Sequence, residues 1–337
     1  MSKYALLIGI NYNKTQNRLY GCINDVIVIR KYLIEKRGYS PENITVLRDD
    51  DASFLLPNKN NILTKFRELI NTANINNSSE IFFHYSGHGT YGRDNNRDEK
   101  DGKDEYICPV DFNFIRDDDI RSLLSKLNNT TTLLGVMDCC HSATNMDLPY
   151  LYNKIGSKII MLEDNSKQYA NLLSKNIYSL SGCRDDQTSA DAYNVYSVLT
   201  DLSDNKYNIT ENNKSGGALT STLLQLLNKT NTVNFINILD QLQINIKNSY
   251  YTQIPLLSSS KNIIPTPNKK PIKKPNKKVI KKVNLQIKQN FSIKQKILIK
   301  RNLPIKRKLL IKLNLTIKRK LLIKPNLLKN IFISKSN

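Results

Sequence analysis

The chain has few residues of the kinds that usually perform covalent chemistry, with three histidines and five cysteines among its 337 residues. No uncharged apolar run approaches the ~18 residues that a transmembrane helix requires, so we expect no membrane span. The N-terminal apolar run KYALLIGI is too short for a signal peptide. No CxxC pair occurs, which together with the missing signal predicts reduced thiols and a cytoplasmic protein. The five cysteines are Cys22, Cys108, Cys139, Cys140 and Cys183.

Acidic residues are absent from the C-terminal part of the chain, and this part carries the excess positive charge. Of the 51 Lys and Arg residues, 24 lie in 261–337, which leaves 27 against all 29 acidic residues in the remainder. The twelve-residue unit IKRNLPIKRKLL (299–310) is repeated as IKLNLTIKRKLL (311–322), and a partial third copy, IKPNLL, follows at 323–328. A low-complexity basic segment of this kind cannot easily form a packed core. We therefore predict a folded domain over 1–262 and a disordered basic tail over 263–337.

The tail alternates Lys or Arg with Ile or Leu, a pattern that can bind nucleic acid or an anionic membrane surface. Its only aromatic residues are Phe291 and Phe332, which argues against base stacking. The plainer interpretation is a low-complexity extension without a selected role, and both interpretations stay open at this point.

Apolar runs of strand length alternate with helical patterns in the first 260 residues. This alternation predicts an α/β fold with a mostly parallel central sheet flanked by helices on both faces. Two polar segments without periodicity, 89–106 and 185–216, are predicted loops. The predicted strands are 4–10, 44–50, 81–86, 131–138, 177–182 and 255–260, the last closing the sheet, and the predicted helices are 24–38, 58–73, 216–228 and 234–247.

Two of the predicted strands end in residues suited to nucleophilic catalysis. His88 follows the first of them between two glycines, and Cys139 and Cys140 directly follow the second. Functional groups in open α/β sheets collect beyond the carboxyl ends of strands, so neighbouring strands would bring a thiol and an imidazole together. Such a pair suits acyl transfer, because the imidazole can deprotonate the thiol and then protonate the leaving amine. Backbone N–H groups of Gly89 and Cys140 could hold the oxyanion.

Spacing alone leaves alternatives. His84 and His141 compete with His88 for the role of the base, and a single histidine near a strand end is more often structural. A buried cysteine is usually an inert small apolar residue, and the sequence pattern does not choose between Cys139 and Cys140.

The segments HYSGHG (84–89) and DCCHS (138–142) resemble the paired signature of metacaspases, cysteine peptidases of family C14 with a caspase-like fold, and the QACxG signature of animal caspases is absent. The resemblance is to type I members that lack a prodomain, and Ala143 stands where the family usually has glycine. It covers residues 4–260 and includes YGCINDV (20–26), DEYICPVDF (104–112), DDDI (117–120), MDLPY (146–150), SGCRDDQTSAD (181–191) and GGALT (216–220).

The resemblance implies specific roles. It makes Cys140 the nucleophile and His88 the base of a cysteine endopeptidase, a hydrolase that passes through a thioester acyl-enzyme and cleaves after Arg or Lys. The implied substrate pocket is formed by Cys22, Asp25, Ser86 and Asp138. The implied site for Ca²⁺, as an activator, is formed by Asp104, Asp117, Asp118 and Asp147. Taken without the resemblance, Asp117–Asp119 would be a solvated loop or the start of a helix, and Asp25 a residue in the first turn of a helix.

The expected partners are protein or peptide substrates with Arg or Lys at the cleavage site, and we expect a monomer. Lys206, Lys214 and the basic tail are candidate sites of self-cleavage. Two other functions remain possible from the sequence: a catalytically inactive caspase-like regulator, and a protein that binds nucleic acid or an anionic surface through its tail.

Overall fold

The computed structural model describes residues 1–94, 102–140, 145–155, 158–164, 167–182, 191–192, 215–229, 234–249 and 251–264. Met1–Pro265 forms one compact unit. The predicted tail from residue 265 onward lies outside the described residues, as do Cys183, His141, Lys206 and Lys214. No helix within the described ranges has the length and hydrophobicity needed to cross a membrane.

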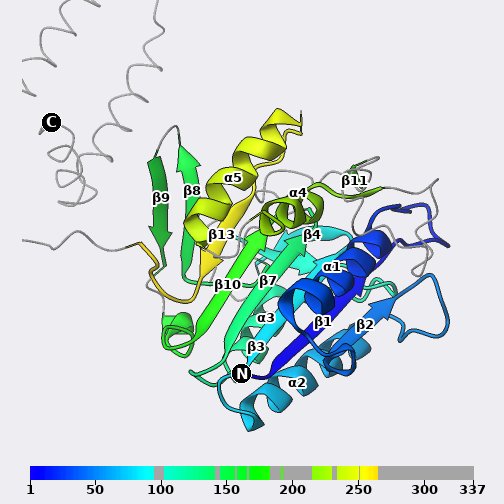
Figure 1. Ribbon diagram of the computed structural model, residues 1–337, viewed down its shortest axis with the longest axis horizontal. Coiled ribbons are helices and arrows are strands. Elements are labelled where there is room, and N and C mark those ends of the chain that lie inside the picture. The colour runs from blue at the N-terminus through cyan, green and yellow to red at the C-terminus, as the bar shows by residue number, and fades with distance from the viewer. Residues whose placement is uncertain are drawn as a thin grey trace, which may run out of the picture. The chain divides into compact units, whose positions relative to one another are not determined.

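An eight-stranded sheet forms the centre of this unit, in the order β2-β1-β3-β7-β10-β13-β8-β9 (Figure 1). The pairings from β2 to β10 are parallel, and those from β10 to β9 are antiparallel. The prediction of a mostly parallel α/β sheet is therefore confirmed. The strands are β1 (Lys3–Gly9), β2 (Ile44–Arg48), β3 (Glu80–Ser86), β7 (Thr132–Asp138), β8 (Tyr150–Ile155), β9 (Lys158–Glu163), β10 (Asn176–Ser181) and β13 (Leu256–Ser259).

Helices cover both faces of the sheet (Figure 1). Successive residues of a strand point to opposite faces, so Ala5 and Leu7 of β1 belong to one core and Leu6 and Ile8 to the other. This explains why the central strands are continuous apolar runs. Helices α1 (Cys22–Arg37), α4 (Ala218–Leu227) and α5 (Phe235–Asn248) pack on the first face, and α2 (Lys59–Ile75) and α3 (Asp117–Leu124) pack on the second.

Local signals explain where the two long N-terminal helices begin and end. Helix α1 ends at Gly38, which has φ 68° and donates its N–H to the carbonyl of Leu33. Glycine adopts this left-handed conformation without strain. Helix α2 begins after Asn58, whose side chain accepts the N–H of Asn61 at 2.8 Å. Short 3₁₀ turns occur at Pro41–Asn43 and Lys167–Tyr169.

The structure corrects three predictions about elements. The segment 89–106 is not simply a loop, because β4 (Gly89–Arg93) and β5 (Lys103–Ile107) pair in it and form a small antiparallel sheet with β6 (Ile115–Arg116). The strand predicted at 255–260 is β13, but it does not close the sheet, because β8 and β9 lie beyond it. The strands that the sequence did not indicate are short or partly exposed, as in β4, β6 and β9, so they lack a clear apolar pattern. The predicted loop 185–216 also contains β11 (Asp191–Ala192), paired with β12 (Gly216–Gly217).

Candidate active site

The two predicted catalytic segments leave the central sheet side by side. Strands β3 and β7 are parallel neighbours, and their last residues, Ser86 and Asp138, are register partners. The N–H of Gly87 donates to the carbonyl of Asp138 at 3.4 Å. His88 follows Ser86 by two residues, and Cys140 follows Asp138 by two residues. The topology therefore places both residues at the same edge of the sheet.

Gly89 allows the backbones of these two segments to touch. A Cβ atom at Gly89 would lie 2.1 Å from the carbonyl oxygen of Cys140 and 3.3 Å from Sγ of Cys139. No side chain fits in that space, so only glycine permits this approach. Gly87 is also closely surrounded, since its Cβ would lie 2.9 Å from the hydroxyl of Tyr85 and 3.0 Å from that of Tyr12.

The imidazole of His88 is held through one nitrogen. Its Nε2 lies 2.7 Å from the carbonyl oxygen of Asn17. A carbonyl only accepts hydrogen bonds, so Nε2 carries the proton and Nδ1 has the lone pair in the neutral ring. The ring centroid of Tyr12 lies 4.7 Å from that of His88, which further restricts the orientation of the imidazole.

Two fully buried tyrosines hold the backbone of His88. The hydroxyl of Tyr12 accepts the N–H of His88 at 2.9 Å, and the hydroxyl of Tyr85 donates to the carbonyl of His88 at 2.8 Å. Tyr12 also donates to the carbonyl of Cys108 at 2.5 Å. Burial raises the pKa of both phenols well above the usual value, so they stay protonated and remain donors. Sequence reasoning missed both residues, although Tyr12 lies two residues after the first predicted strand.

The two adjacent thiols differ in accessibility. Cys139 is buried, and the side-chain N–H of Asn145 donates to its sulfur at 3.3 Å. Cys140 is half-buried, which makes it the more accessible of the two. A third thiol, that of Cys108, interacts electrostatically with Cys140. Burial raises the pKa of Cys108 to about 12, and Cys140 makes a smaller contribution. Within the described residues, no disulfide joins Cys22, Cys108, Cys139 or Cys140.

The predicted pocket residues gather around the start of α4. Asp25, in the first turn of α1, is fully buried and accepts Oγ–H of Ser86 at 2.6 Å and N–H of Gly217 at 2.9 Å. Asp138 accepts both N–H and Oγ–H of Thr220 at 2.8 Å. A Cβ at Gly217 would lie 2.0 Å from Oδ2 of Asp138, so the backbone of Gly217 contacts both aspartates.

The fourth predicted pocket residue, Cys22, is buried in the first turn of α1, and its N–H donates to Oδ1 of Asn11 at 3.1 Å. Gly217 and Thr220 were not predicted as site residues, although both belong to the GGALT motif.

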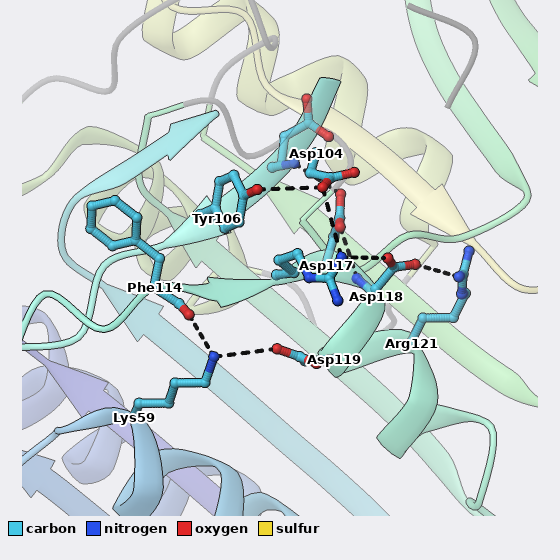
Figure 2. A network of polar contacts seen from close by, with 10 residues as sticks. Lys59, Asp104, Tyr106, Phe114, Asp117, Asp118, Asp119 and Arg121 are labelled. Atoms are coloured by element: carbon cyan, nitrogen blue, oxygen red, sulfur yellow. Dashed lines mark hydrogen bonds and ion pairs between the residues drawn. The ribbon is translucent and has the colours of Figure 1, made fainter. Parts of the chain in front are cut away.

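Three of the predicted calcium ligands form an acidic cluster (Figure 2). One carboxylate oxygen each of Asp104, Asp117 and Asp118 lies within 4.8 Å of the others. Burial, and to a smaller extent the negative charge of Asp147, raises the pKa of Asp117 to about 7 against the opposing effect of the N–H of Glu105. Burial, then Asp94 and Asp118, also raises the pKa of Asp104. Burial therefore disfavours the charged form of both carboxyl groups, and neighbouring negative charges add to this effect.

Asp147 approaches this cluster from the segment after Cys140. Its Oδ1 accepts the hydroxyl of Tyr169 at 2.6 Å, and its Oδ2 lies 2.6 Å from a guanidinium nitrogen of Arg121. Arg121 also forms an ion pair with Asp118, so it links the two carboxylates. A second arginine, Arg116, lies 3.6 Å from Asp118.

The three consecutive aspartates also form the first turn of α3, which agrees with the prediction of a helix start made without the resemblance. Asp119 belongs to this turn but takes no part in the cluster. It pairs with Lys59 at 3.5 Å on another side of the helix, as Figure 2 shows.

The family model described as "Metacaspase, peptidase C14 domain" matches residues 3–149. The chain is 32% identical to Metacaspase-1 of Scheffersomyces stipitis over 304 residues, covering 77% of the chain and 70% of that protein. It is 31% identical to Metacaspase-1 of Meyerozyma guilliermondii, again over 77% of the chain and 69% of the relative. The crystal structure of a Geobacter sulfurreducens protein matches the fold with a TM-score of 0.52 and 19% identity, covering 79% of this chain and 96% of that one.

Proposed function

Because the chain belongs to the metacaspase family of cysteine-type peptidases, we propose that it is a calcium-dependent endopeptidase that cleaves after Arg or Lys. The observation that supports this most directly is the pairing of the β3 and β7 ends. It brings His88 and Cys140 to one edge of the sheet, next to a buried pair of aspartates.

Cys140 is the proposed nucleophile and His88 its acid/base partner. With Nε2 bonded to the carbonyl of Asn17, Nδ1 of His88 takes the thiol proton as the sulfur attacks the scissile carbonyl. The same nitrogen then protonates the leaving amine, and water hydrolyses the thioester. The orientation by Asn17 and Tyr12 favours this exchange, because a fixed imidazole loses little freedom in the transition state.

The proposed oxyanion donors are the backbone N–H groups of Gly89 and Cys140. The N–H of Cys108 bonds the carbonyl of His88, and the antiparallel register pairs Gly89 with Ile107. Hydrogen-bonded and non-bonded pairs alternate in such a ladder, so the N–H of Gly89 points away from β5. On that side Gly89 contacts Cys140, which is where the proposed oxyanion would bind.

The proposed preference for Arg or Lys follows from the charge of the pocket. Asp25 and Asp138 are both buried beside Gly217, and two nearby carboxylates favour a cationic partner and disfavour an acidic one. Donors from Ser86, Gly217 and Thr220 offset part of the repulsion between them. The pocket is thus organised before a substrate arrives.

The acidic cluster is suited to calcium. Calcium prefers six to eight hard oxygen ligands, and Asp104, Asp117, Asp118 and Asp147 supply carboxylate oxygens. Burial, and to a smaller extent the charge of Asp147, raises the pKa of Asp117 to about 7, so its ionised form would be favoured by positive charge beyond that of Arg116 and Arg121. When bound, calcium would supply that charge. These residues would then connect β5, α3 and the segment after Cys140, which we propose orders the site.

Hydrolysis of fluorogenic peptides tests this function. Peptides ending in Arg, Lys or Asp before the fluorophore are compared with calcium and with EGTA, using wild type and Cys140→Ala. We expect calcium-dependent cleavage of the Arg and Lys peptides that Cys140→Ala abolishes. Activity in EGTA would contradict the calcium requirement, and preference for Asp would contradict the pocket assignment. Self-cleavage at Lys206 or Lys214, the monomeric state and binding by the tail stay predictions.

A further inference from the structure

Helix α4 begins without a capping side chain of its own. Its N-cap residue is Gly217, which makes no side-chain hydrogen bond. Asp138, 82 positions away in the chain, instead accepts the N–H of Thr220 in the first turn of the helix. The same carboxylate oxygen, Oδ2, accepts the hydroxyl of Thr220, and both distances are 2.8 Å. Two donors from one residue therefore fix the rotation of the Asp138 carboxylate.

His84 continues this chain of hydrogen bonds into the core. It is fully buried on β3, and its Nε2 lies 3.1 Å from Oγ1 of Thr220. The threonine hydroxyl has one proton, which it gives to Asp138, so it must accept the next bond. Nε2–H of His84 therefore donates to Thr220, and the bonds run in one direction from His84 through Thr220 to Asp138. Burial lowers the pKa of His84 to about 3, which keeps the ring neutral and the direction unchanged at ordinary pH.

The same short turn also binds the other pocket aspartate. The N–H of Gly217 lies 2.9 Å and 3.1 Å from the two oxygens of Asp25. Residues 217 and 220 thus hold one carboxylate each, three positions apart. A guanidinium group has fixed donor directions, so the angle between the two carboxylates decides how well it is bound.

We propose that Thr220 is a specificity-determining positioning residue that fixes Asp138 for an Arg or Lys side chain, and that His84 orients its hydroxyl. Neither residue contacts the substrate in this account. The inference rests on the proposed function, because it assigns the binding of the substrate cation to Asp25 and Asp138. It adds the residue that orients Asp138. Thr220 and His84, which were not predicted as pocket residues, thereby become part of the structure that supports the pocket.

The alternative is a purely structural role, in which Asp138 only caps the N-terminus of α4 through Thr220. The two accounts differ in what they predict for kinetics. Loss of a helix cap lowers stability and affects every function of the folded protein in the same way. Loss of carboxylate positioning raises KM for basic peptides and leaves the reactivity of the Cys140 thiol unchanged.

Thr220→Val removes the hydroxyl with little change of shape, and Thr220→Ser keeps it. Thr222→Val, at a buried threonine two positions further along α4, is the matched control. The readouts are kcat and KM for an Arg peptide, the melting temperature, and the rate at which iodoacetamide alkylates Cys140. We expect Thr220→Val to lower kcat/KM about 10- to 100-fold, the usual effect of losing a hydrogen bond to a charged group, chiefly through KM. Thr220→Ser and Thr222→Val should stay near wild type.

His84 gives an independent second test. His84→Gln offers an amide donor to Thr220, whereas His84→Leu offers none, so only the leucine variant should raise KM. An unchanged KM in Thr220→Val and His84→Leu, or a fall in alkylation rate that matches the fall in kcat/KM, would overturn the inference. If Thr220→Val does not fold, the comparison of His84→Gln with His84→Leu decides in the same way. A wild-type enzyme without preference for Arg or Lys would instead refute the proposed function itself.

Discussion

Arg121 is the residue whose charge most directly opposes calcium at the acidic cluster. Its guanidinium lies 2.6 Å from Asp147 and also pairs with Asp118, two of the four proposed ligands. Figure 2 shows its side chain directed at Asp118. An internal cation and a bound ion would compete for the same carboxylates, so Arg121 would set how much calcium is needed.

Replacing Arg121 by methionine removes the charge and keeps an unbranched apolar stem. We expect calcium to bind about tenfold more tightly, which corresponds to ~1.4 kcal/mol, as measured by isothermal titration calorimetry. The calcium-free protein should become less stable, since buried carboxylates lose a partner. Lys59→Met is the control, because Lys59 pairs with Asp119 outside the cluster. Weaker calcium binding in Arg121→Met would mean that Arg121 supports the site.

His84 should make stability depend on pH. Its pKa in the folded protein is about 3, below the ordinary value of 6.5, so the unfolded chain takes up a proton first as pH falls. The stabilisation from a neutral His84 is therefore complete above pH 6.5 and is lost progressively between pH 6.5 and pH 3. At pH 5 the free energy of unfolding should be lower by about 2 kcal/mol for this reason. Urea unfolding of wild type and His84→Gln at pH 7 and pH 5 measures this. The difference between the two proteins should shrink at pH 5, and parallel pH profiles would contradict the assignment.

At the scale of elements, the contact between the start of β4 and the end of β7 is the most constrained. Gly89→Ala would place a methyl group 2.1 Å from the carbonyl of Cys140, so the two segments must separate. A displacement of about 1 Å can cost ~100-fold in rate, and we expect a loss of this size in kcat/KM for an Arg peptide. Gly38→Ala, at the end of α1, is the control, because its Cβ would meet nothing within 4 Å beyond its chain neighbours among the described residues. Equal activity of both variants would contradict the proposed contact.

The elements that sequence could predict are those with strong apolar patterns. β3 and β7 were predicted within one residue of their observed bounds, because buried parallel strands are continuous apolar runs. β4 and β5 were not predicted, because their local composition does not favour strands. They are stabilised by the pairing of Gly89–Arg93 with Lys103–Ile107.

The same reasoning explains which parts of the site were missed. The residues predicted for catalysis, the pocket and calcium all stand in continuous motifs. The carbonyl of Asn17 belongs to the backbone, so no residue pattern indicates its contact with His88. Thr220 meets Asp138 across 82 positions, and Arg121 is one of many basic residues until the fold places it between Asp118 and Asp147. Contacts of this kind depend on topology and become visible only in three dimensions.

For the whole molecule, the proposed chemistry and the excess charge lie in different parts of the chain. Every proposed catalytic, pocket and calcium residue lies within Met1–Pro265, whereas 24 Lys and Arg lie in 261–337. A chain shortened to residues 1–264 should therefore keep its kcat/KM for small peptides. It should lose any binding to polyanions that weakens with salt. Peptide assays and salt titrations of the full and shortened chains check both outcomes, and loss of peptide hydrolysis would give the tail a part in catalysis.

The most direct test of the convergence of Cys140 and His88 is covalent labelling with an Arg-containing peptide acyloxymethyl ketone, located by mass spectrometry. We expect one adduct on Cys140 in the calcium-loaded enzyme, none on the buried Cys139, and much slower labelling in His88→Ala. An adduct on Cys139, or equal labelling rates with and without the His88 imidazole, would contradict the proposed catalytic pair.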